Sequence, residues 1–233
     1  MSLWKSLRKM QFLDGTALKI MAMVSMVIDH VGDSFFPQQI WMRAVGRIAM
    51  PIFAFCIAEG FIHTHDRGRY LLRMLIFGLI SEIPFDLVTS GKILEFGHQN
   101  IMLTFSWAIL GLTCCDKIIG KERSPGRNLA AAAILVAFLA VSVCLRLDYS
   151  MLALALVAVF YLLRVKNLWI RNTVAAAVHA AIRNVGIHWF GLLGFVPLYM
   201  YNGKRGKGLK WVFYLFYPCH FLVIFLIKRK VMA

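Results

Sequence analysis

The sequence predicts an all-α fold: a polytopic transmembrane helical bundle with about 8–9 transmembrane helices and a cytoplasmic N-terminus. The chain has 233 residues and is 60% hydrophobic but only 16% charged, whereas soluble domains carry about 25% charged residues. Its apolar segments follow one another with short polar gaps, and the lysines and arginines are concentrated in those gaps. We therefore expect a single membrane-embedded domain over residues 1–233, with lipid around most of its surface.

The predicted helices are the apolar segments that approach the roughly 20 residues needed to cross a bilayer core. They lie near residues 16–34, 43–62, 70–88, 100–115, 129–145, 150–164, 173–187, 189–201 and 211–228. The sixth and the eighth are short. The seventh is rich in alanine and carries His179 and Arg183, so it is either a weak span or an interfacial helix.

The distribution of basic residues predicts the orientation. Cations precede the first helix and then occupy alternate loops: Lys5, Arg8, Lys9, Arg67, Arg69, Arg73, Lys117, Lys121, Arg123, Arg127, Arg164, Lys166 and Arg171. Loops 35–42, 89–99 and 146–149 hold few cations. Because cytoplasmic loops are enriched in Lys and Arg, the N-terminus is expected in the cytoplasm. The side of the C-terminus stays open, since it depends on whether both 173–187 and 189–201 cross.

The net charge and the cysteines exclude other functional classes. The formal charge of +15 follows the loops and is a topology signal, so no nucleic-acid partner is expected. The five cysteines form no C-x-x-C pair and lie in or beside apolar segments. Neither a disulfide framework nor a metal site is expected from them.

Ionisable residues in the outer halves of the helices are the main functional signal, because such groups are costly inside a membrane. The topology places these residues at one depth: Asp29, His30, Arg43, Arg47, Glu82, Asp86, His98, Asn100, Asp148 and Tyr149. We expect one connected cavity lined by Asp29, His30, Arg47, Glu82, Asp86 and Asn100. His30 is the natural proton carrier there. Buried ion pairs that only hold helices together are the alternative, and Asp29 either pairs with Arg47 or orients a substrate.

The expected cytoplasmic side has a different pattern. Glu59 ends the second predicted helix, and 202–208 is a glycine-rich basic turn of the kind that can hold phosphate groups through N–H donors and cations. A plain basic cytoplasmic loop is the simpler explanation of that turn. His220 lies within the last helix beside Pro218.

Several short motifs recur together in an order typical of one family. They are Leu13-Asp14-Gly15, Ile28-Asp29-His30-Val31-Gly32, Gly46-Arg47-Ile48-Ala49-Met50-Pro51, Glu59-Gly60-Phe61, Ser81-Glu82-Ile83-Pro84-Phe85-Asp86, Gln99-Asn100-Ile101, Asp148-Tyr149, Tyr201-Asn202-Gly203-Lys204-Arg205-Gly206 and Tyr217-Pro218-Cys219-His220. In this combination the chain resembles the TraX family over about residues 13–225. Cys219 replaces an expected leucine and Ser150 an expected glycine. Neither change removes a candidate catalytic group.

The resemblance implies an acetyl-CoA-dependent acyltransferase that crosses a bacterial cytoplasmic (inner) membrane several times. The donor is acetyl-CoA, and the acceptor is an unidentified amine or hydroxyl on the far side, in a small molecule, a sugar or a peptide N-terminus. The implied catalytic residues are His30 as general base, Asp29 and Arg47. The implied acceptor-binding residues are Glu82, Asp86, Asn100, Asp148 and Tyr149, and the implied acetyl-CoA-binding residues are Glu59, Asn202, Lys204, Arg205 and His220. Direct and ping-pong transfer both stay open, as does a homo-oligomer. A proton-coupled small-solute transporter is the alternative function.

Overall fold

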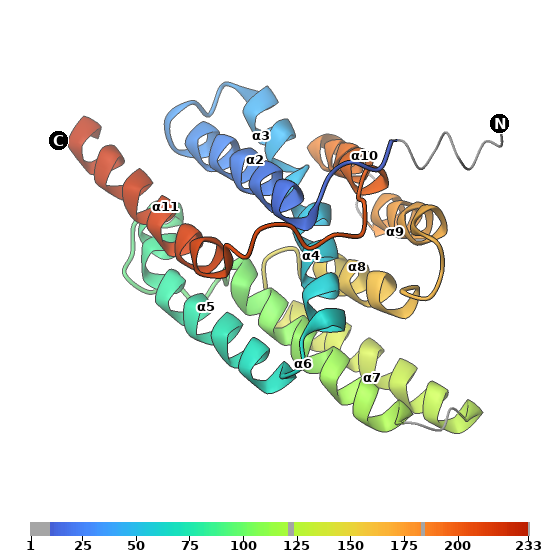
Figure 1. Cartoon of the computed structure of the whole chain (residues 1–233). Helices are drawn as coiled ribbons and strands as arrows, with labels where there is room; N and C mark the ends of the chain where they lie inside the picture. Colours follow the sequence, from blue (N-terminus) through green and yellow to red (C-terminus); the bar gives the residue numbers. More distant parts are fainter. Residues whose placement is uncertain (1–9, 121–123, 183–184, 233) are drawn as a thin grey trace.

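The fold is a bundle of α-helices, seen in a computed structural model that describes residues 10–120, 124–182 and 185–232 (Figure 1). The predictions that involve Lys5, Arg8, Lys9, Lys121, Arg123 and Arg183 lie outside these residues. The helices are α2 (Gly15–Phe35), α3 (Ile40–Gly46), α4 (Ala49–His63), α5 (Arg67–Thr89), α6 (Ile101–Ile119), α7 (Pro125–Cys144), α8 (Ser150–Leu162), α9 (Leu168–Ile182), the 3-10 helix η1 (Gly186–Gly194), α10 (Phe195–Tyr199) and α11 (Lys210–Met232). The all-helical prediction is confirmed.

Local signals explain several helix starts that differ from the expected ranges. α7 begins at Pro125 because Ser124 accepts a hydrogen bond from the backbone N–H of Arg127, and proline suits the first helical position. α9 begins at Leu168, several residues before the expected start. The side chain of Asn167 accepts a hydrogen bond from the N–H of Ile170 at 2.9 Å and so provides the missing cap.

The second predicted helix is broken into α3 and α4 by a turn at Arg47 and Ile48. Pro51 explains the break, because a proline ring clashes with the carbonyl four residues earlier, here that of Arg47, and provides no N–H donor for it. Gly194 of η1 packs into the break, where an added Cβ would lie 2.6 Å from the carbonyl oxygen of Ile48. The break therefore shapes the backbone around Arg47.

The surface of the bundle is strongly apolar. Large hydrophobic side chains are exposed along α5, α7 and α11, for example Leu79, Val136 and Leu222. α4 lies at the centre of the molecule, and most of its side chains are buried (Figure 1). Among the described residues, five helical segments are long and apolar enough to cross a membrane: Gly15–Phe35, Ile40–His63, Ile101–Ile119, Pro125–Cys144 and Lys210–Val231. This is a helical membrane protein, and the total of 8–9 crossings stays a prediction.

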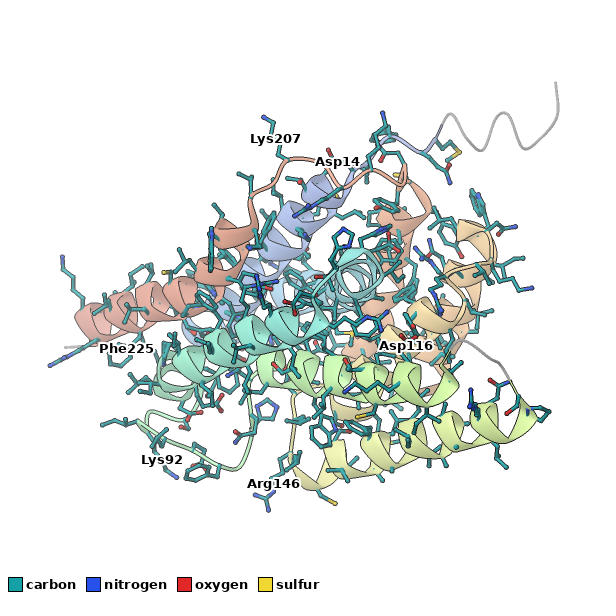
Figure 2. The ribbon with its side chains drawn as sticks, turned by 60° about the horizontal axis from the view of Figure 1, so that its bottom comes forward. Asp14, Lys92, Asp116, Arg146, Lys207 and Phe225 are labelled. Atoms are coloured by element: carbon teal, nitrogen blue, oxygen red, sulfur yellow. The ribbon has the colours of Figure 1, made fainter. Side chains whose placement is uncertain are left out.

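The loops gather at two opposite ends. At one end the backbone of Gln99 pairs with the turn before α8, through bonds to Arg146 and Asp148 of 3.1 Å each. At the other end Leu13 pairs with Met200 and Asn202. Figure 2 shows Lys92 and Arg146 on one side of the molecule and Asp14 and Lys207 on the other. We call these the outer and the inner end, after the expected orientation.

The last part of the chain runs out and back before the final helix. The Tyr199 hydroxyl at the end of α10 lies 2.8 Å from that of Thr173, near the start of α9, so the two segments are antiparallel. α11 then runs beside α5 in the same direction, and Lys228 donates a hydrogen bond to the carbonyl of Val88 at the outer end. The end of α11 therefore lies on the side of loop 90–100, which is the arrangement expected if both 173–187 and 189–201 cross.

Candidate functional site

The Asp29 carboxylate is the centre of an ion cluster between α2 and α3. Arg43 Nη1 lies 2.9 Å from Oδ1 of Asp29, and Arg47 Nη2 lies 2.9 Å from Oδ2. The side chains of Asp29 and Arg47 are 10% and 11% exposed, so solvent weakens their attraction little. Gly46 permits the close approach of the helices, because a Cβ there would lie 2.2 Å from Asp29 Cγ. Of the two expectations for Asp29, pairing with Arg47 is the one observed.

Arg47 also connects this cluster to the turn before α8. Its Nη1 donates a hydrogen bond of 2.6 Å to the hydroxyl of Tyr149, and its Nε donates to the carbonyl of Arg43. Tyr149 has a φ of 53°, in the left-handed region that non-glycine residues rarely adopt. The Arg47 guanidinium at the end of α3 thus contacts both α2 and the turn before α8.

His30 hydrogen-bonds with His220 of α11 and not with Asp29. Its Nδ1 lies 2.9 Å from Nε2 of His220, and Nδ1 of His220 lies 3.1 Å from the carbonyl oxygen of Phe216. A carbonyl can only accept, so His220 Nδ1 carries a proton. In the neutral ring Nε2 of His220 then accepts the proton of His30 Nδ1. His30 Nε2 is therefore an unprotonated acceptor, and no hydrogen bond to it occurs among the described residues. The ring of Phe221 packs on His30, with centroids 4.4 Å apart.

The polar side chains of α5 bond mainly to the loop and helix that follow. Asn100 caps α6 by accepting hydrogen bonds from the N–H groups of Met102 and Leu103, and it donates to Glu82 and to the carbonyl of Gly78. Asp86 accepts a 2.7 Å bond from the N–H of Glu95. One oxygen of Glu82 and one of Asp86 stay buried without a partner among the described residues.

A cavity of about 250 Å³ opens at the outer end beside Arg47. It is lined by Arg47, His98, Val143, Arg146, Leu147, Asp148, Tyr149, Ser150 and His188. Arg47 is the only member of the expected six-residue cavity among these lining residues; Asp29, His30, Glu82, Asp86 and Asn100 are absent from them. Asp148 and Tyr149, expected to bind the acceptor, do line it. This cavity therefore leaves out the other five residues, among which Asn100 bonds to Glu82 and Asp86 accepts from the backbone of Glu95.

His98 is paired with Asp148 across the mouth of this cavity. Its Nε2 lies 3.5 Å from Oδ1 of Asp148, and its ring stacks on Phe85. The hydrogen-bonding contact with the Asp148 carboxylate raises the pKa of His98 above its usual value, because the negative charge stabilises the protonated ring. The cavity therefore gains positive charge as the pH falls through that raised pKa.

At the inner end Glu59 is held by Arg171 of α9 and by Tyr201, the residue before the glycine-rich turn. Arg171 donates to its Oε1 at 2.8 Å, and the hydroxyl of Tyr201 lies 3.4 Å from Oε2. Tyr201 immediately precedes Asn202, so the turn 202–208 does lie near Glu59 as expected.

Hydrogen bonds from the start of α2 hold the 202–208 turn. The backbone N–H of Gly15 donates to the carbonyl of Lys204, and the hydroxyl of Thr16 donates to the carbonyl of Lys207 at 2.8 Å. The side chain of Asn202 accepts from the N–H of Lys204 within the turn and donates to the carbonyl of Phe12, in the segment before α2. Lys204 and Arg205 are exposed. Their cationic side chains are therefore presented on a fixed loop.

Three groups of residues were not identified from the sequence. Asp116 of α6 bonds to both Arg67 and Tyr161, which joins α5, α6 and α8 at the inner end. Both polar side-chain atoms of buried Asn172 lack a partner among the described residues. Arg146 and His188 line the outer cavity. An acidic residue in the last turns of an apolar helix was a usable signal for Asp116. Nothing in the local sequence marks Asn172, Arg146 or His188.

Comparison with known proteins identifies the family. The sequence profile described as TraX protein matches residues 14–228. The probable fimbrial assembly protein FimC, serogroup H1, of Dichelobacter nodosus is 28% identical, over 89% of this chain and 92% of its own length. Protein TraX of Escherichia coli is 31% identical over 52% of this chain and 45% of its own length.

An uncharacterized protein of Rickettsia prowazekii (strain Madrid E) is 39% identical over 37% of this chain and 32% of its own length. No solved structure matches the chain. The profile match covers helices α2 to α10, most of α11 and every residue of the two polar clusters described above, so the chain belongs to the TraX family.

Proposed function

We propose that the chain is an integral membrane acyltransferase that passes an acetyl group from cytoplasmic acetyl-CoA to an acceptor on the outer side. The favoured acceptor group is an amine, with a hydroxyl as the other possibility. The observation that carries this proposal is the hydrogen-bond series from the carbonyl of Phe216 through His220 to His30, which leaves Nε2 of His30 unprotonated. A positioned imidazole nitrogen of this kind is the usual general base in proteins.

The proposed reaction follows from that nitrogen. His30 Nε2 takes the proton of the acceptor amine or hydroxyl as the acceptor atom attacks the thioester carbonyl carbon. A new bond to that carbon forms and the carbon–sulfur bond breaks, and the thiolate of CoA leaves with the proton returned from His30. His220 acts through His30 as a positioning residue, because its Nε2 fixes which nitrogen of His30 carries a proton.

Arg47 is suited to stabilise the oxygen that becomes negative during the attack. Its guanidinium is held by Asp29, Tyr149 and the carbonyl of Arg43. Nη1 uses one N–H for Tyr149 and has a second one to donate. A fixed, partly desolvated donor of this kind lowers the energy of a developing oxyanion more than a mobile one would.

The inner end is suited to the phosphates of acetyl-CoA. Lys204 and Arg205 are exposed on a loop whose backbone is hydrogen-bonded to the start of α2. Because the loop is already held in place, binding of a phosphate to these two cations costs little backbone entropy. Glu59 and its partner Arg171 lie beside this loop through Tyr201. His220, expected from sequence to bind acetyl-CoA, is assigned here to positioning the base His30.

The family and one relative's name narrow the acceptors worth testing. FimC of Dichelobacter nodosus is named for fimbrial assembly, so a pilin N-terminal peptide belongs in an acceptor panel beside small amines and amino sugars. A proton-coupled transporter remains the competing function, and the unpartnered buried oxygens of Glu82 and Asp86 are the observation in its favour.

The test uses purified protein incubated with isotopically labelled acetyl-CoA and the acceptor panel. The proposal predicts labelled acetylated acceptor by mass spectrometry, with one free CoA thiol released for each acetyl group transferred. No product and no thiol above background with any acceptor would contradict it. Under the transporter alternative, the same protein in proteoliposomes would instead move protons together with a small solute.

A further inference from the structure

The outer cavity is unusually rich in positive charge for a site in a membrane protein. Its lining includes two arginines and two histidines but only one carboxylate: Arg47, Arg146, His98, His188 and Asp148. Charged groups in such a partly enclosed space act strongly on a ligand, because the low-dielectric walls reduce screening. The net positive charge of the lining residues therefore influences which ligands the cavity binds.

Arg47, His98 and Asp148 each have a direct ionic partner. Arg47 shares the Asp29 carboxylate with Arg43, and Asp148 is paired with His98. Arg146 makes no direct ion pair among the described residues: Glu95 of loop 90–100, which its charge influences at longer range, is in direct contact with Lys92 at 2.6 Å. Figure 2 shows Arg146 at the outer side of the molecule, at the turn between α7 and α8. A cation without a direct ion pair thus lines the cavity.

The backbone that presents this cation is strained and firmly held. In the described part of the chain, the non-glycine residues with positive φ are Arg146, Tyr149 and Ser150, at 52°, 53° and 24°. All three line the cavity. Their turn is kept in place by the two backbone bonds to Gln99. Strain concentrated in one turn is typical of functional sites, where the surrounding structure holds a side chain in a required position.

We propose that this cavity binds a carboxylate or phosphate group of the acceptor, and that Arg146 is its main cationic partner. The inference rests on the proposed acetyl transfer and specifies its acceptor as an amine or hydroxyl that carries a nearby anionic group. Of the acceptor-binding residues implied by the resemblance, Asp148 and Tyr149 line this cavity, whereas Glu82, Asp86 and Asn100 are absent from its lining. Tyr149, held by Arg47, joins the cavity to the Asp29 cluster.

Matched acceptors test this directly. Ethanolamine and phosphoethanolamine present the same amine without and with a phosphate, and alaninamide and alanine do the same for a carboxylate. Acetyl transfer is measured as CoA thiol released at saturating acetyl-CoA. The anionic member of at least one pair should be the better acceptor by kcat/KM, and the pair that responds tells phosphate from carboxylate.

The variants are Arg146→Gln and the control Arg229→Gln, which removes one exposed positive charge beside Lys228 at the same end of the molecule, outside the cavity lining. Arg146→Gln should raise the KM for the anionic acceptor by about tenfold, the effect of one lost charge-assisted contact at a half-open site, with kcat little changed. It should leave the uncharged acceptor unaffected, and Arg229→Gln should alter the KM of neither acceptor. A wild-type protein that prefers ethanolamine and alaninamide overturns the inference, as does an Arg146→Gln protein with unchanged KM.

A binding measurement separates this inference from the proposed function. Calorimetry of phosphoethanolamine and alanine with the detergent-solubilised protein, without acetyl-CoA, should show binding that weakens in Arg146→Gln and persists in Arg229→Gln. If that pattern appears but no acceptor is acetylated, the transfer reaction fails and the anion site stands. If acetylation occurs but neither anion binds, the acceptor assignment alone is wrong.

Discussion

Gly46→Ala is the most sensitive probe of the Asp29 cluster, because it adds one methyl group and changes no charge. An ideal Cβ at this position would lie 2.2 Å from both Cβ and Cγ of Asp29, and 2.6 Å from Oδ1. Carbon atoms in ordinary contact are about 3.5–4.0 Å apart. Either α2 and α3 must separate or the carboxylate must turn away, and both movements disturb the ion pair with Arg47.

The expected cost combines overpacking with a weakened ion pair. Overpacking a core costs about 1–3 kcal/mol, and breaking a buried ion pair costs about 3–5 kcal/mol. Because Arg43 can keep part of the contact, we expect a total of about 3 kcal/mol. For a chain of this size that corresponds to a fall in Tm of about 6–12 °C.

The assay is thermal unfolding in detergent, followed by circular dichroism and by loss of the monodisperse peak in size-exclusion chromatography. Gly126→Ala is the matched control, because Gly126 lies on α7 with no atom within 4 Å of its added Cβ. The control should melt within about 2 °C of the wild type or slightly above it, as alanine favours helix. A Gly46→Ala protein that melts like this control would refute the close approach of Gly46 and Asp29.

Three further outcomes are expected. His98→Gln should be less stable than the wild type at pH 6, by no more than about 0.5 kcal/mol at this half-exposed site. The Asp148 contact raises the pKa of His98. The stability difference between the two proteins is therefore complete below the usual histidine pKa of about 6.5 and disappears as the pH rises through the raised pKa. If thermal melts show the difference growing with pH, the pairing is wrong. Replacing Lys204 and Arg205 by glutamine should weaken acetyl-CoA binding in calorimetry, more at low salt than at high salt. The control Arg69→Gln, which removes an exposed inner-end cation paired with Asp66, should not weaken it. If the double variant and the wild type bind acetyl-CoA equally well, the turn is only a topology signal. Asp116→Asn should lower Tm through the loss of its bonds to Arg67 and Tyr161, at a cost of about 1–3 kcal/mol, and an unchanged Tm would show that this cluster does not brace α5, α6 and α8.

The sequence predicted the helices and the level of each polar group in the bundle because both follow from one-dimensional patterns. The length of an apolar segment identifies a membrane-crossing helix, and the alternation of basic loops assigns each end of that helix to one side of the membrane. Arg43 and Arg47, one turn apart, were therefore placed at the level of Asp29, and they contact it. Asn100, read as the start of the fourth helix, caps α6 as a residue of that type does at a helix start.

What could not be predicted is rotation about helix axes and the identity of neighbouring helices. His220 was assigned to the donor site, yet it meets His30 because α11 packs beside α2 and α5, a contact between residues 190 positions apart. Arg171 looked like a loop cation until Asn167 proved to cap a longer α9, which directs it to Glu59. The outer cavity depends on the positive φ values of Arg146 and Tyr149, and non-glycine residues give no local sign of such a conformation.

The pair His30 and His220 is the centre of the proposed chemistry, and its two members should behave differently when replaced. His30→Ala removes the base, and general-base catalysis contributes about 10²–10⁴-fold. His220→Phe leaves the base but removes the acceptor that fixes its tautomer. It should lower kcat by a smaller factor, with the KM for the acceptor unchanged.

The decisive measurement is acetyl transfer from labelled acetyl-CoA by His30→Ala, followed as CoA thiol released, with acetyl-CoA binding measured on the same preparation by calorimetry. The account predicts that turnover falls by about 10²–10⁴-fold while the affinity for acetyl-CoA stays within about twofold of the wild type. A His30→Ala protein that binds acetyl-CoA and turns over at a near wild-type rate would contradict it.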